Sequence, residues 1–165
     1  MSDSPRILVA GVGNIFLGDD AFGVEVIRAL SRRPAIQNVR LVDFGIRGLD
    51  LAYALTESCD LAILVDAVPR GGAPGTLYTL VPDVSDAPAG GLDAHGMTPV
   101  NVLALASRLG KPVAPVVLVG CEPSFADPAM DAVDVPAGLS EPVARAVEPA
   151  AERVLALIRE VIPKG

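Results

Sequence analysis

The chain has 165 residues, of which 51 % are hydrophobic and 4 % aromatic, and its formal net charge is −7. This length suits a single domain over residues 1–165, because a chain of this size can bury enough surface to form its own core. The acidic balance and the scarcity of aromatic residues argue against nucleic-acid binding, which normally needs a basic surface. The richest apolar stretches, 61–65 and 113–119, are far shorter than the roughly 20 residues of a membrane-spanning helix. Because residues 1–6 hold no apolar signal segment, we expect a cytoplasmic protein without a membrane partner.

The first part of the chain alternates between strand and helix patterns. Apolar runs that end in glycine or aspartate indicate buried strands, and apolar residues at helical spacing indicate amphipathic helices. The predicted elements are a strand over 6–12, a helix from Phe22 that ends before Pro34, a strand over 39–43, a helix over 45–57 and a strand over 61–66.

The remaining elements follow the same logic, with two long loops between them. A glycine-rich turn leads into a fourth strand over 76–81, which should run antiparallel to its predecessor because no helix connects the two. The loop over 82–97 comes next. We then expect a helix with Thr98 at its N-cap and Gly110 at C′. A fifth strand over 113–120 and a loop over 121–139 follow it. The last predicted element is a helix that is capped by Ser140 and is kinked or broken at Pro149.

These elements predict a three-layer α/β/α sandwich around a mixed, mostly parallel five-stranded sheet. In such folds ligands bind beyond the carboxyl ends of the strands. Several polar residues fall at or near this edge, which makes it the predicted site. They are Asp19 and Asp20 after the first strand, Asp66 at the end of the third, Cys121 and Glu122 after the fifth, and His95 in the loop over 82–97.

Three of these residues form a candidate metal site, although each has a simpler explanation. Asp20 can serve as a helix cap, Asp66 can accept hydrogen bonds from loop amides, and the single histidine, His95, can be an ordinary polar loop residue. Together, however, one imidazole and two carboxylates make a mixed nitrogen and oxygen site that suits a divalent transition metal such as zinc or nickel. Three protein ligands with one open position are also typical of catalytic metal sites.

Other chemistries fit the sequence less well. The glycine-rich turn after the first strand has Phe16 where a dinucleotide-binding motif requires glycine, and acidic residues follow where a pyrophosphate would lie. No G-x-S-x-G motif marks a serine nucleophile. Cys121 can in principle pair with His95 as a thiolate, but a small buried apolar cysteine is the favoured interpretation.

The same residues resemble the conserved motifs of the hydrogenase maturation endopeptidases, and the resemblance covers nearly the whole chain in order. His95 falls where that family places its histidine. The matching blocks are Ile7 to Asn14 with Gly18-Asp19-Asp20 and Gly23, Asp43-Phe44-Gly45 with Gly48, Val65-Asp66-Ala67 with Pro74-Gly75-Thr76, Val119 to Pro123, and Glu148-Pro149.

The resemblance implies an endopeptidase that removes the C-terminal extension of a nickel–iron hydrogenase large-subunit precursor after nickel insertion. Asp20, Asp66 and His95 would then be both the metal ligands and the catalytic residues, with the nickel supplied by the precursor. Two positions depart from the family pattern: Ala21 replaces a common glycine, and Asp20 stands where some members have glutamate. The metal can polarise the scissile carbonyl, activate water or serve only for recognition, or a carboxylate can be the general base. The rival functions are a small-molecule hydrolase or phosphorylase, and a metal chaperone or nucleotide-binding module.

Overall fold

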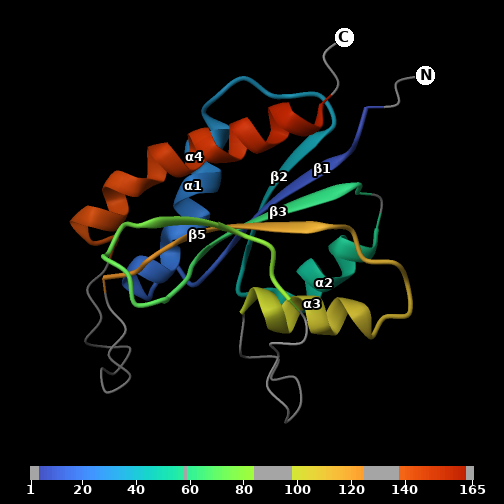
Figure 1. The fold of residues 1–165 in the computed structure, drawn as a ribbon, viewed down its shortest axis with the longest axis horizontal. Coiled ribbons are helices and arrows are strands. Elements are labelled where there is room, and N and C mark those ends of the chain that lie inside the picture. The colour runs from blue at the N-terminus through green and yellow to red at the C-terminus, as the bar shows by residue number, and fades with distance from the viewer. Residues whose placement is uncertain (1–3, 58, 84–97, 125–137, 163–165) are drawn as a thin grey trace.

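Five strands form one mixed sheet in the computed structural model, which describes residues 4–57, 59–83, 98–124 and 138–162 (Figure 1). The strand order is β2-β1-β3-β5-β4, with β2, β1, β3 and β5 parallel and β4 antiparallel to β5 at one edge. The strand bounds are β1 Ile7–Val12, β2 Val39–Gly45, β3 Leu61–Ala67, β4 Leu77–Leu80 and β5 Val116–Cys121.

Two helices cover each face of this sheet, which confirms the predicted three-layer α/β/α arrangement (Figure 1). Helices α1 and α4 pack on one face, and α2 and α3 pack on the other. A short 3-10 helix, η1, leads directly into α1. The helix bounds are η1 Gly18–Ala21, α1 Phe22–Ser31, α2 Gly48–Thr56, α3 Pro99–Ser107 and α4 Glu141–Val161.

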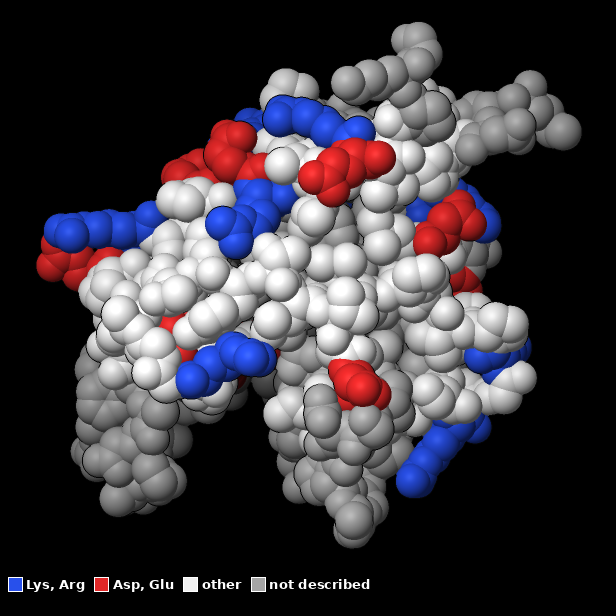
Figure 2. All heavy atoms as spheres, in the orientation of Figure 1, with Lys and Arg blue, Asp and Glu red and all other residues white. Residues whose placement is uncertain are grey.

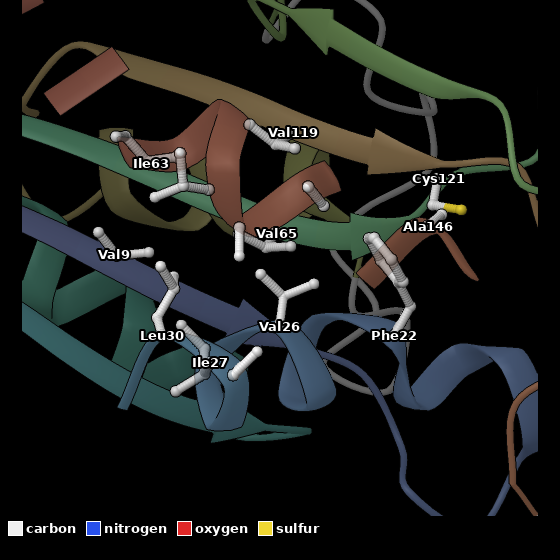
Figure 3. Packing of buried hydrophobic residues seen from close by; sticks show 14 of the residues in the cluster. Val9, Phe22, Val26, Ile27, Leu30, Ile63, Val65, Val119, Cys121 and Ala146 are labelled. Atoms are coloured by element: carbon white, nitrogen blue, oxygen red, sulfur yellow. The ribbon is translucent and has the colours of Figure 1, made fainter. Parts of the chain in front are cut away.

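Alternation along the central strands supplies both faces of the core. In β1, Ile7 and Val9 point to α1 and α4, whereas Leu8 and Ala10 point to α2 and α3. Such strands read as continuous apolar runs because both of their faces are buried. Figure 3 shows the hydrophobic cluster on the α1 and α4 face of the sheet, where side chains of β1, β3 and β5 meet those of α1 and α4. Charged side chains of both signs cover the outer side of α4 (Figure 2).

Three predicted details differ in the structure. The fourth strand runs antiparallel as expected, but it does not pair with β3, because β5 lies between them. Helix α4 runs through Pro149 without a break. Thr98 caps α3 by accepting a hydrogen bond from the Asn101 amide, whereas Gly110 lies two residues beyond the C-cap Arg108 rather than at C′. The first difference matters most, because it determines which segments meet at the carboxyl edge.

Gly23 allows α1 to lie against the ends of two strands. A Cβ atom at this position would collide with the backbone carbonyl oxygens of Val12 and Val65. We therefore expect Gly23→Ala to lower the free energy of unfolding by about 3 kcal/mol, the upper range for overpacking. Urea denaturation measures this loss. The control is Gly110→Ala, because Gly110 has no neighbouring atoms that a Cβ would meet and has φ +77°. For this variant we expect only the cost of the left-handed backbone conformation, about 1–2 kcal/mol. An equal loss in the two variants would contradict the steric argument.

Candidate active site at the carboxyl edge of the sheet

Asp20 is held at this edge by the loop that follows β1. It lies in η1, and its Oδ2 accepts a hydrogen bond of 2.8 Å from the backbone amide of Asn14. The side chain is half-buried. Burial raises the pKa of the Asp20 carboxyl above its ordinary value, and the hydrogen bond from Asn14 opposes that shift. The loop therefore holds the Asp20 carboxyl group in place, and burial disfavours its ionised form.

Asp66 lies near the end of β3 and is 5 % exposed. Its Oδ1 accepts a hydrogen bond of 2.8 Å from the amide of Ala67. Burial raises the pKa of Asp66 well above its ordinary value, and the charge of Asp20 raises it further. The structure thus brings two acids from separate segments together, close enough for one to influence the ionisation of the other.

The two carboxyl groups share a further property. Each has one oxygen held by a backbone amide, and within the described residues its other oxygen accepts no hydrogen bond and neither group has a basic partner. A close pair of uncompensated carboxyls tends to retain a proton or to bind a cation, because like charges at short range disfavour double ionisation. The pair can therefore accept a proton from water or hold a metal ion.

A cavity of about 410 Å³ opens beside Asp66. Apolar side chains of β4 and β5, Leu80 and Leu118, form part of its wall. Asp83 and Thr98, which flank residues 84–97, also line it. A larger cavity of about 530 Å³ lies at the opposite edge, where the strands begin, and neither Asp20 nor Asp66 lines it. Asp66 lines the cavity at the carboxyl edge, although Asp20 does not form part of its wall, so we take the space beside Asp66 as the candidate substrate site.

His95 lies outside the described residues, as does most of the loop predicted over 82–97. The structure therefore brings together Asp20 and Asp66, and the inclusion of His95 stays a prediction. Across the part of the chain that the structure describes, no three side chains of histidine, cysteine, aspartate or glutamate gather as a metal-binding set.

Comparison with known proteins identifies the family. A profile of the family described as hydrogenase maturation protease matches residues 24–157. The chain belongs to the hydrogenase maturation protease family. It is therefore a protease of the endopeptidase type and a hydrolase, which confirms the resemblance inferred from the sequence motifs.

Individual relatives match over almost the whole protease chain. The hydrogenase 2 maturation protease of Escherichia coli K12 is 33 % identical over 94 % of this chain and 92 % of its own. A putative hydrogenase maturation protease of Methanocaldococcus jannaschii is 34 % identical over 93 % and 97 %. Among solved structures, the hydrogenase maturating endopeptidase HybD from E. coli has a TM-score of 0.73 at 30 % identity, covering 96 % of this chain and 98 % of that one.

Asp19, the neighbour of Asp20, has a structural role in the protease. It is 6 % exposed, and its carboxylate accepts hydrogen bonds from the Ser124 amide and from both the amide and the hydroxyl of Ser140, at 2.7–2.8 Å. These bonds tie η1 to the end of β5 and to the start of α4. Neither Asp19 nor Asp20 caps α1, and the Ser140 side chain, used by Asp19, does not cap α4.

Glu122, which the sequence places at this edge, has a structural role that the sequence did not identify. Its carboxylate accepts hydrogen bonds from the amides of Arg70 and Gly72 and from the Tyr78 hydroxyl, each at 2.8–3.1 Å. Burial works to raise the pKa of Glu122, but these hydrogen bonds outweigh it and hold the pKa below its ordinary value. Glu122 therefore fixes the turn between β3 and β4 that follows Asp66. Its position after a strand was visible in the sequence, but the partners become adjacent only once β5 enters the sheet.

Cys121 is fully buried at the end of the α1 and α4 cluster (Figure 3). Burial, followed by the charges of Asp19 and Glu122, raises the pKa of its thiol to about 11. At neutral pH almost no thiolate forms, so Cys121 lacks the nucleophilic form. We expect Cys121→Ala to retain most of its processing rate while losing about 1 kcal/mol of stability through the smaller side chain. Mass-spectrometric processing assays on the folded variant measure this, and complete loss of cleavage would place Cys121 in the catalytic machinery.

In the described part of the chain, no helix is long and apolar enough to cross a bilayer. The cytoplasmic location stays a prediction.

Proposed function

We propose that this protease removes the C-terminal extension of a nickel–iron hydrogenase large-subunit precursor after nickel has been inserted. The observation that carries the proposal is the pair of carboxyls, Asp20 and Asp66, at the carboxyl edge of the sheet. Each presents an oxygen without a hydrogen-bond donor among the described residues. Family membership makes a hydrogenase precursor the expected protein partner.

In this proposal Asp20, Asp66 and His95 bind the nickel that the precursor carries. Two carboxylate oxygens and one imidazole are a donor set that suits nickel. In the sequence His95 is three residues before Thr98, which lines the same cavity as Asp66. The metal belongs to the substrate, and the protease supplies the ligands that recognise it.

The carboxyl pair also supplies the proton chemistry that peptide hydrolysis needs. A water oxygen attacks the scissile carbonyl carbon and gives its proton to an ionised carboxylate. The C–N bond then breaks, and the proton passes to the leaving amine. An acid whose pKa is raised by burial and by a neighbouring charge is suited to both transfers, because its pKa lies closer to the working pH.

The direct test compares nickel-loaded and nickel-free precursor as substrates. We expect the nickel-loaded precursor to lose the mass of a C-terminal peptide and the nickel-free precursor to remain intact, because the three ligands would have no metal to recognise. Intact-protein mass spectrometry reads both outcomes in one experiment. Equal processing of the two forms would contradict the nickel requirement, and no processing of either would contradict the proposed activity.

The same assay separates the rival functions. A metal chaperone would take up nickel from the precursor without changing the precursor's mass. A small-molecule hydrolase would leave both metal and mass unchanged. The protease assignment of the family argues against each of these rivals.

A further inference from the structure

The exposed large apolar side chains of the described residues are concentrated near the candidate site. Five of them lie on the loop after β1 or on the segment that runs from β2 into α2. The most exposed are Phe16 at 78 %, Ile46 at 62 % and Leu49 at 55 %. We call this group the apolar rim, and its members are Ile15, Phe16, Ile46, Leu49 and Tyr53.

Both segments of the apolar rim leave the sheet at the same edge. The strands that precede them, β1 and β2, are paired up to their ends, and the Gly13 amide donates a hydrogen bond of 2.9 Å to the Gly45 carbonyl. Leu49 and Tyr53 are four residues apart in α2, so they share one exposed side of that helix, and Ile46 lies in the turn that leads into it. The opposite side of α2, with Leu51 and Leu55, is buried in the core.

Phe16 is tied directly to the candidate catalytic residues. The Asn14 amide donates to Asp20 Oδ2 at 2.8 Å, and the Asn14 side-chain oxygen accepts from the Phe16 amide at 2.9 Å. Asn14 thus holds both the Asp20 carboxylate and the backbone at Phe16. A protein chain that presents a peptide bond to Asp20 would therefore pass close to Phe16, a member of the apolar rim.

We propose that the apolar rim is a docking surface for an apolar patch on the folded precursor, next to the segment that carries the scissile bond. This inference rests on the proposed function. The rim is continuous with the enzyme–substrate interface at Asp20, which a protease must offer to its protein substrate. A second copy of the chain bound there would block the approach to Asp20, so the precursor is the occupant that the position favours.

The chemistry around the rim fits an uncharged partner surface. Its basic and acidic neighbours, Arg47 and Asp50, lie 3.6 Å apart as an ion pair, and the Arg47 guanidinium also lies over the Phe44 ring. The pair leaves little net charge to select a charged partner. Aromatic side chains such as those of Phe16 and Tyr53 are enriched at protein interfaces, and exposed apolar patches are typical of protein interaction sites.

The test uses the double variant Phe16→Ser/Leu49→Ser and the full-length nickel-loaded precursor. All substituted side chains are exposed, so the fold should persist, which thermal unfolding verifies. We expect KM for the precursor to rise about tenfold or more with kcat within about twofold, since the rim binds away from the reacting atoms. The matched control is Val161→Ser, which alters an exposed apolar residue at the end of α4 and should leave KM unchanged.

A second measurement keeps the inference separate from the proposed activity. Binding of immobilised precursor to the Asp20→Asn protein is compared with and without the two serine substitutions, and weaker binding by about tenfold supports docking even if no cleavage occurs. Unchanged KM and unchanged binding would overturn the docking surface while leaving the proposed activity standing. Sedimentation adds a third outcome: a wild-type dimer that the double variant converts to monomer, with KM unaltered, would assign the rim to a second copy and overturn the proposal.

Discussion

Asp66→Asn is expected to abolish processing of the precursor while making the protein more stable at neutral pH. Asparagine has nearly the same shape and keeps an oxygen for the Ala67 amide, but it can neither accept a proton nor present an anionic ligand. When Asp66 is ionised, its charge is buried and repelled by the charge of Asp20, which is unfavourable. Removing that charge should raise the free energy of unfolding by about 1 kcal/mol, a usual gain when a strained functional site is relieved.

The pH dependence gives this prediction a second test. The pKa of Asp66 is higher in the folded protein than in the unfolded chain, so its contribution to stability is present below the unfolded pKa and is lost as the pH rises through the folded pKa. The stability gain of Asp66→Asn should therefore be largest where the pH lies above the folded pKa of Asp66, and it should shrink as the pH falls below that pKa. Thermal unfolding at several pH values follows the difference.

Asp20→Asn provides the companion variant, with loss of processing and a smaller stability gain, because Asp20 is only half-buried. If either variant were destabilised and still active, both carboxyls would be structural residues and the candidate site would be wrong.

Replacing the neighbouring Asp19 by asparagine should lower the stability of the protein, in contrast to the gain expected for Asp20→Asn. In Asp19→Asn, the new amide group would face backbone or hydroxyl donors, because all three hydrogen bonds to Asp19 are donated by Ser124 and Ser140. At least one buried donor would lose its acceptor, and the hydrogen bonds to a charged group would weaken. We expect a loss of about 3 kcal/mol in the free energy of unfolding, which corresponds to a drop of about 6–12 °C in Tm.

Differential scanning calorimetry of Asp19→Asn and Asp20→Asn at the same pH makes the comparison. Ser124→Gly, which keeps the backbone amide that Asp19 accepts from, is the control and should cost far less. A Tm for Asp19→Asn equal to that of the wild type would show that the link between η1 and α4 contributes little to the stability of the protease.

Much of this fold could be predicted from the sequence because its local signals agree. Continuous apolar runs identify β1, β3 and β5 as strands covered on both faces, and Thr98 at the N-cap with Pro99 at the first helical position defines where α3 begins. The position of β4 could not be predicted in the same way. Its connection to β3 excludes a helix but does not reveal that β5, far along the chain, lies between the two.

The site was predictable in part. Parallel strands bring their carboxyl ends to one edge, so Asp20 and Asp66 were expected to converge there. In the structure the charge of Asp20 acts on Asp66, and the shared site with His95 stays a prediction. The different roles of Asp19 and Asp20 could not be separated from their sequence, because the partners that distinguish them are distant residues such as Ser140. The role of Glu122 was not predictable for the same reason, since its partners Arg70 and Gly72 are about fifty residues away.

The placement of β5 between β3 and β4 has a consequence for the order of synthesis. The segment after Asp66 is held by residues that the ribosome adds much later: the Val68 amide donates to the Cys121 carbonyl, and the Gly75 amide donates to that of Glu122. Strand β4 has its ladder partner only in β5. A nascent chain that ends before Val116 thus has the acids of the site but lacks the strand that holds β4 in the sheet and that contributes Leu118 to the cavity wall. We infer that proteolytic competence arises late in translation, after most of the chain has already emerged.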